Sequence, residues 1–115
     1  MYEFIIDNSK LSGTVLFNGK LTIQNSTIIK NFLQESIKQV EHLHINHKNA
    51  DEFDISYIQL LVSTFKTAVK NNKQFSVINN HPENFTALLK DSGCPEFNWM
   101  SEMENIEITG EHTNE

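Results

Sequence analysis

The spacing of apolar side chains along the chain predicts alternating strands and helices. Residues 2–8 place apolar side chains at alternate positions, which is typical of a strand. A run of strand-forming side chains at residues 14–17 predicts a second strand. Asn18 and Gly19 follow, and this pair favours a tight turn or a bulge because both residues tolerate a positive φ angle. Residues 20–23 then either close the strand pair or form another short strand.

Two longer stretches show the 3.6-residue period of amphipathic helices. The apolar side chains of residues 28–40 form one stripe, which predicts a helix over about residues 26–40. Residues 25–27 offer candidate N-caps for this helix. A second stripe within residues 58–69 predicts another helix, which the polar residues 71–73 stop.

The remaining stretches predict two strands, a loop and a short helix. Residues 42–46 alternate and indicate a strand, whereas residues 48–52 are polar and are expected to form a loop. Residues 75–78 predict the next strand. Pro82 suits the start of a third helix, and the Gly and Pro within residues 92–95 suit its end. The apolar face of this helix consists of Phe85, Leu88 and Leu89.

This order of elements predicts a single α/β domain. Strands that alternate with helices form a parallel or mixed sheet with right-handed crossovers. We expect a single-layer mixed β-sheet of four to five strands, which begins with an antiparallel pair and carries its helices mainly on one face. The domain spans residues 1–108, in which residues 51–54 are a loop and not a linker. Ile106 and Ile108 suit a last strand or a helix edge, whereas the sequence leaves the structure and role of residues 97–108 as a whole open. The polar residues 109–115 are expected to be disordered.

Composition narrows the classes of function. The chain has 115 residues with 15 acidic and 9 basic side chains, a formal net charge of −6, and every basic residue is Lys. This balance argues against nucleic-acid binding and against an anionic membrane surface. No apolar run is long enough to cross a membrane, and the first residues lack the layout of a signal peptide. The single Cys, Cys94, cannot form an internal disulfide and suits a reducing compartment. We therefore expect a small cytoplasmic domain.

The residues that could carry chemistry form no catalytic or metal-binding motif. His42 and His44 would point the same way from a strand, as two metal ligands could, and His47 follows them. No third ligand is placed to complete that set, so two exposed His opposite a Leu43/Ile45 core face are the preferred interpretation. Cys94 has no partnering base, and no glycine-rich phosphate loop is present. We expect no metal, no cofactor and no enzymatic activity.

The most informative stretch is the polar start of the second long helix. Asp54 or Ser56 can cap free backbone N–H groups there, and an acidic residue suits the positive end of a helix. A hydroxyl at a helix N-terminus is also a place where a phosphate can be held. The sequence alone leaves both the capping and the switch interpretation open.

Several segments together resemble a STAS domain, the fold of bacterial anti-sigma factor antagonists. They are residues 19–23, 43–46, 53–61, 73–77 and 88–93, and the resemblance covers about residues 10–93. It implies a module that binds a protein partner. In that family the unphosphorylated domain docks on an ATP-binding, kinase-like partner, and phosphorylation at the start of the second helix breaks the complex.

The expected site departs from the family pattern at its centre. Asp54 matches the family Asp, but Ile55 stands at the position of the phosphoacceptor, and Tyr57 stands where the family has a small residue. Ser56 carries the nearest hydroxyl and is the candidate phosphoacceptor. The resemblance implies that the partner-binding residues are Asp54, Ile55, Ser56, Tyr57 and Gln59.

Three functions follow as hypotheses. The first is a regulatory module that docks a kinase-like anti-sigma factor or a chemotaxis or two-component kinase. The second is an accessory subunit that binds the ATPase of an ABC-type lipid exporter without needing a phosphate. The third is a small-ligand or nucleotide-binding domain at the sheet end. Whether the chain forms a homodimer stays open at this point.

Overall fold

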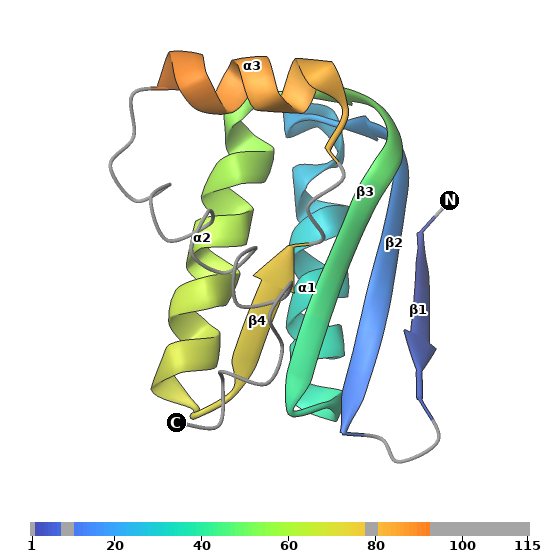
Figure 1. Ribbon diagram of the computed structural model, residues 1–115, viewed down its shortest axis with the longest axis vertical. Coiled ribbons are helices and arrows are strands. Elements are labelled where there is room, and N and C mark those ends of the chain that lie inside the picture. The colour runs from blue at the N-terminus through green and yellow to red at the C-terminus, as the bar shows by residue number, and fades with distance from the viewer. Residues whose placement is uncertain (1, 8–10, 78–80, 93–115) are drawn as a thin grey trace.

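The computed structural model describes residues 2–7, 11–77 and 81–92 of the chain (Figure 1). Strands and helices alternate through these residues, as the apolar pattern predicts. The elements are β1 (Glu3–Ile6), β2 (Ser12–Leu21), the short 3-10 helix η1 (Ile23–Asn25), α1 (Ser26–Gln39), β3 (His42–Phe53), α2 (Ile55–Lys70), β4 (Gln74–Val77) and α3 (Glu83–Ser92).

The four strands form one mixed sheet in the order β1-β2-β3-β4. β1 pairs with β2 in antiparallel fashion, whereas β2 with β3 and β3 with β4 are parallel pairs. Figure 1 shows α1 and α2 side by side along one face of the sheet, and α3 across the end of α2 and β3. The expected mixed sheet, its antiparallel first pair and its helices on one face are therefore confirmed.

The hydrophobic core lies between the sheet and the helix pair. Alternate residues of β2 and β3 point toward the helices and are buried, as the two-residue period of a strand requires. The buried apolar side chains of the central strands and the two long helices include Val15, Phe17, Leu43, Ile45, Ile29, Leu33, Ile58 and Leu61.

Strand β2 is longer than predicted. It runs through Asn18 and Gly19 without turning, and its register against β3 shifts between Leu16 and Asn18 and again between Gly19 and Lys20. Gly19 has a φ angle of 79°, which a residue with a side chain adopts only with strain. The expected bulge is confirmed, whereas the tight turn and the separate strand at residues 20–23 are wrong.

Strand β3 continues to Phe53, so the predicted loop at residues 48–52 is wrong. The loop predicted at residues 51–54 is also wrong for residues 51–53, because only Asp54 lies between β3 and α2. Most side chains of residues 48–52 are polar and face solvent, which is why the sequence suggested a loop. Their backbone nevertheless continues the parallel ladder with β2. On the other edge, β4 pairs with β3 only as far as Val77 opposite Ile45. Helix α3 packs beside the second half of β3, where the Asn84 side-chain amide donates a hydrogen bond of 2.9 Å to the Asp51 carbonyl.

The side chain of Lys73 caps the C-terminal end of α1. The Lys73 ammonium donates hydrogen bonds to the carbonyls of Ile37 at 2.7 Å and Val40 at 3.0 Å, with a longer contact to Lys38 at 3.3 Å. The last carbonyls of a helix have no partner within the helix, and a cation complements their partial negative charge. Lys73 follows α2 in the chain, so this contact ties the ends of the two long helices together.

The remaining predictions concern residues outside the described ranges. They include the role of Cys94, the placement of residues 97–108 and the state of residues 109–115. In the part of the chain that the structure describes, no helix combines the length and the apolar character that crossing a membrane requires.

Candidate functional site

The Asp54 side chain joins the start of α2 to η1. Its Oδ1 accepts hydrogen bonds from the Ser56 backbone N–H at 3.0 Å and from the Ser56 hydroxyl. Its Oδ2 accepts a bond of 2.8 Å from the Ile23 N–H, and the Asp54 N–H donates to the Leu21 carbonyl at 3.2 Å. Asp54 therefore holds three element ends relative to one another: its carboxylate binds the starts of η1 and α2, and its backbone N–H binds the end of β2.

Hydrogen bonding keeps this carboxylate ionised. Partial burial alone would raise the pKa of Asp54, but the bonds from the Ser56 hydroxyl and from the Ile23 and Ser56 N–H groups outweigh burial and lower it. The positive end of α2 favours the same charged state. Asp54 is therefore the N-cap of α2, which confirms the capping interpretation for this residue.

The five predicted partner-binding residues differ in exposure. Ile55 is 43% exposed and Gln59 is exposed, whereas Asp54 is half-buried. Ser56 is only 9% exposed, and its hydroxyl points at Asp54. The Tyr57 side chain is fully buried in the core beneath the start of α2, so it offers no surface to a partner in this conformation.

Tyr57 reaches a buried histidine that sequence reasoning did not place in the core. The Tyr57 hydroxyl lies 2.7 Å from His47 Nδ1, and His47 Nε2 lies 2.8 Å from His81 Nδ1. His47 is 1% exposed, and its ring contacts Phe53 and Phe85 at centroid distances of 5.3 and 4.2 Å. This Tyr57–His47–His81 chain connects α2, β3 and the segment that leads into α3.

The buried imidazole is neutral. Burial, with a smaller contribution from the neighbouring His81, lowers the pKa of His47 to about 3. A neutral ring carries one N–H, so His47 donates to one neighbour and accepts from the other. Burial also raises the pKa of Tyr57, with Tyr2 adding to the shift. The burial of His47 could have been predicted from the sequence, because His47 lies two and four positions after the core residues Ile45 and Leu43 and so shares their face of the strand.

The other two histidines of the string lie on the opposite face of the sheet. His42 Nε2 and His44 Nδ1 contact the Ser76 hydroxyl at 2.9 and 3.1 Å, and the two rings lie 4.0 Å apart. They point the same way, as predicted, but they are half-buried and not exposed as expected. Within the described residues, no group of three or more His, Cys, Asp or Glu side chains is placed to hold a metal ion.

Comparisons with known proteins give matches among solved structures. A scan against protein-family models finds no match, and a search of curated proteins finds none either. The chain is similar to the anti-sigma factor antagonist SpoIIAA in its unphosphorylated form, with 13% identity and a TM-score of 0.61 over 77% of this chain and 82% of that one. The phosphorylated form of the Bacillus cell fate determinant SpoIIAA matches at 13% identity and a TM-score of 0.62, over 81% and 84% of the chains.

A third solved structure is an anti-sigma factor antagonist STAS domain from Rhodobacter sphaeroides. It shares 14% identity with this chain at a TM-score of 0.60, over 73% of this chain and 92% of that one. The chain therefore has the STAS-type fold of SpoIIAA, which confirms the fold that the resemblance implied. Two of these structures are described as anti-sigma factor antagonists and the other as a cell fate determinant.

Proposed function

We propose that this chain is a cytoplasmic regulatory module of the anti-sigma antagonist type, which docks a kinase-like signalling protein at the start of α2. The docking surface is the Asp54 face, which we define as Ile23, Asp54, Ile55 and Gln59. The observation that carries the proposal is the anchored Asp54 carboxylate between two large exposed apolar side chains, Ile23 at 63% and Ile55 at 43% exposure.

The Asp54 face has the properties of an interaction surface that is formed before binding. Burying a fully exposed Ile side chain contributes about 1.5–3 kcal/mol, so burial of the partly exposed Ile23 and Ile55 would each contribute a part of that. The hydrogen bonds from Ile23 and Ser56 to the carboxylate already hold η1 and α2 in place, so little chain ordering opposes association. The solved SpoIIAA structures support a protein partner for this fold, and they come from an anti-sigma factor antagonist.

Ser56 remains the candidate phosphoacceptor of this proposal. Its hydroxyl donates to Asp54 and is buried, so phosphorylation requires the side chain to leave the carboxylate. A phosphate adds about −1.5 to −2 charges, which would then repel the Asp54 carboxylate. Phosphorylation would thus separate the start of α2 from η1 and disrupt the docking surface.

A second candidate function is docking of an ABC-type transporter ATPase without phosphorylation. The exposure of Ile55 favours it, because an apolar side chain occupies the position that the STAS family uses for the phosphoacceptor. On this alternative, Ile55 fills an apolar pocket of the ATPase, and Ser56 serves only the start of the helix.

Affinity purification from the native host, with quantitative mass spectrometry, tests the proposal. The baits are the unmodified chain, Ile55→Asp, and the matched control Ile28→Asp, whose side chain is similarly exposed at 58% on α1. We expect a kinase-like ATP-binding protein to be lost with Ile55→Asp and kept with Ile28→Asp. Recovery of an ABC ATPase in that pattern would favour the alternative, and equal recovery by all three baits would exclude the Asp54 face.

A further inference from the structure

The net charge of the chain is concentrated in its last residues. Residues 1–92 contain all nine Lys and nine of the 15 acidic residues, so their formal charges cancel. Residues 93–115 contain the other six acidic residues, all of them Glu, and no Lys. The whole formal charge of −6 therefore belongs to this acidic segment, which begins directly after α3.

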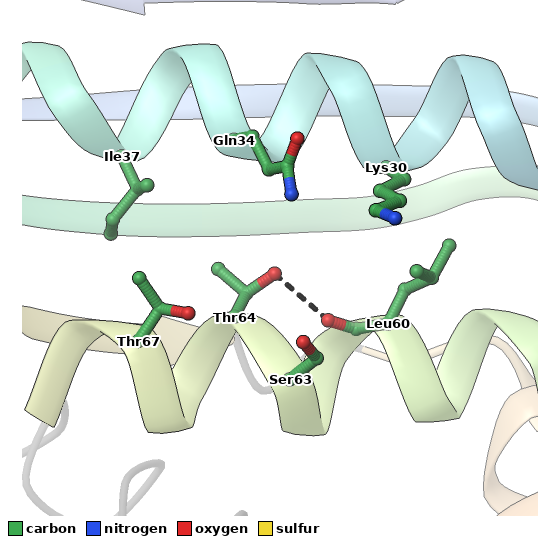
Figure 2. A pocket seen from close by; sticks show the side chains of 7 residues that line it. All are labelled: Lys30, Gln34, Ile37, Leu60, Ser63, Thr64 and Thr67. Atoms are coloured by element: carbon green, nitrogen blue, oxygen red, sulfur yellow. Dashed lines mark hydrogen bonds between the residues drawn. The ribbon is translucent and has the colours of Figure 1, made fainter. Parts of the chain in front are cut away.

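The outer surface of the helix pair has the opposite character. Figure 2 shows Lys30 and Gln34 of α1 facing Ser63 and Thr67 of α2 across a shallow groove. A second hollow along α2 is lined by Lys66 and Lys70 and shares Ser63 and Thr67 with the first. We call this continuous surface the basic groove and define it by Lys30, Ser63, Lys66, Thr67 and Lys70.

The lysines of the basic groove have no acidic partner among the described residues. The two hollows contain these three Lys and no Asp or Glu in their described lining. Glu35 is the only acidic residue of α1 and α2, and it pairs with Lys38 at 3.5 Å. The groove therefore combines uncompensated positive charge with the hydroxyl groups of Ser63 and Thr67, which can donate hydrogen bonds to carboxylates.

We propose that the acidic segment, residues 93–115, occupies the basic groove of the same chain. Charge complementarity selects the occupant, because this segment carries six Glu and the groove carries three Lys. The segment is tethered at Ser92, so its effective concentration at the groove greatly exceeds that of a separate acidic partner. Its 23 residues can extend to about 75 Å, which exceeds the longest dimension of the molecule, 33 Å.

Zero-length carbodiimide cross-linking of the full chain tests this inference, since it joins a Lys to a carboxylate only when they touch. We expect the monomer at low salt to link Lys66 or Lys70 to a Glu of residues 93–115, as read by peptide mass spectrometry. The exposed Lys48 of β3 is the matched control and should form no such link. Salt at about 0.5 M should reduce the yield several-fold, because surface charges are then screened.

Control variants and one expected link inside the folded domain allow each cross-linking result to be interpreted. The Lys38–Glu35 pair should link in every sample and shows that the chemistry has worked. The double variant Lys66→Glu/Lys70→Glu should lose the links from the acidic segment to α2, whereas Lys48→Glu should keep them. Absence of these links in the unmodified chain, while Lys38–Glu35 links form, would overturn the inference. Links found only between two copies, or only to an added acidic protein, would overturn it as well.

Discussion

A charged side chain joins distant parts of the chain at two places, and the two places differ in what surrounds the contact. Lys73 binds the last backbone carbonyls of α1, and the side chains of the two residues Ile37 and Val40 that carry them are buried. Asp54 binds the first N–H groups of η1 and α2, and the neighbouring Ile23 and Ile55 are exposed. The same kind of contact therefore completes the core at one place and holds apolar side chains toward solvent at the other.

This difference separates residues that contribute to stability alone from residues that contribute to both stability and partner binding. A contact that only completes the core should affect folding when it is removed, and binding should be unchanged for the molecules that remain folded. A contact that positions exposed apolar side chains should affect both. The following experiments test that separation, and their expected effects on stability decrease in order.

Acid should lower the free energy of unfolding more than any substitution described below. It should act through His47 and Asp54. His47 has a pKa of about 3 when folded and about 6.5 when unfolded, so the unfolded chain binds more protons between these values. The free energy of unfolding should fall as the pH drops from about 6.5 toward 3, by up to about 1.4 kcal/mol per pH unit. Below about pH 4 protonation of Asp54 lowers the free energy of unfolding further, because the pKa of Asp54 is lowered in the folded state and only the ionised carboxylate stabilises the fold.

Urea unfolding at a series of pH values measures this effect. The variant His47→Gln keeps a donor and an acceptor without titrating, so its free energy of unfolding should depend less on pH in this range. Lys73→Met should keep the full pH dependence. Identical pH profiles for His47→Gln and the unmodified chain would show that His47 does not control acid stability.

Replacing Lys73 should have the next largest effect. Lys73→Met keeps most of the aliphatic side chain but removes the hydrogen bonds to the Ile37 and Val40 carbonyls. Hydrogen bonds from a charged donor contribute about 1.5–3 kcal/mol, so we expect a loss of about 2–3 kcal/mol by urea unfolding. Partner affinity, measured on the folded fraction, should not change. A tenfold loss of affinity would contradict the separation.

Replacing Asp54 should reduce both quantities. Asp54→Ala removes the N-cap of α2 and the bond to Ile23, which should cost about 1–2 kcal/mol of stability. Affinity for the partner should also fall, by about tenfold or more, because η1 and α2 are no longer held together. Isothermal titration with the purified partner measures this, and unchanged affinity would remove Asp54 from the docking surface.

Shortening Ile55 should affect stability least. Its side chain is already 43% exposed, so Ile55→Ala should change the free energy of unfolding by less than about 1 kcal/mol. The same variant should weaken partner binding by about tenfold. Ile28→Ala is the control of similar exposure and should leave affinity unchanged. Equal affinities for the two variants would place the docking surface elsewhere.

The sequence predicted the helices well because their apolar stripes are long and regular. The stripe of α1 matches its buried residues Ile29, Leu33 and Ile37. It also predicted a cap at the start of α2, because acidic and hydroxyl residues at a helix start have a local function. It could not predict the bond from Asp54 to Ile23, which joins residues 31 positions apart.

Strand β3 and the buried polar chain were harder to predict. Residues 48–52 are polar, and only their ladder with β2 shows that they form a strand. Tyr57 lies four residues before the buried Leu61, so the helical period indicates burial for it as well. The period does not identify the partner of its hydroxyl, because that partner, His47, lies on another element.

The length of β3 has a consequence for how this chain behaves at high concentration. β3 extends past its ladder with β4, so the second half of one of its edges has no described strand beside it. Such an edge can add a strand from another molecule and start aggregation. Helix α3 crosses the end of β3 (Figure 1). There the Asn84 side-chain amide donates a hydrogen bond to the Asp51 carbonyl. α3 thus does more than complete the fold, because it covers the end of a strand edge that would otherwise be open to self-association.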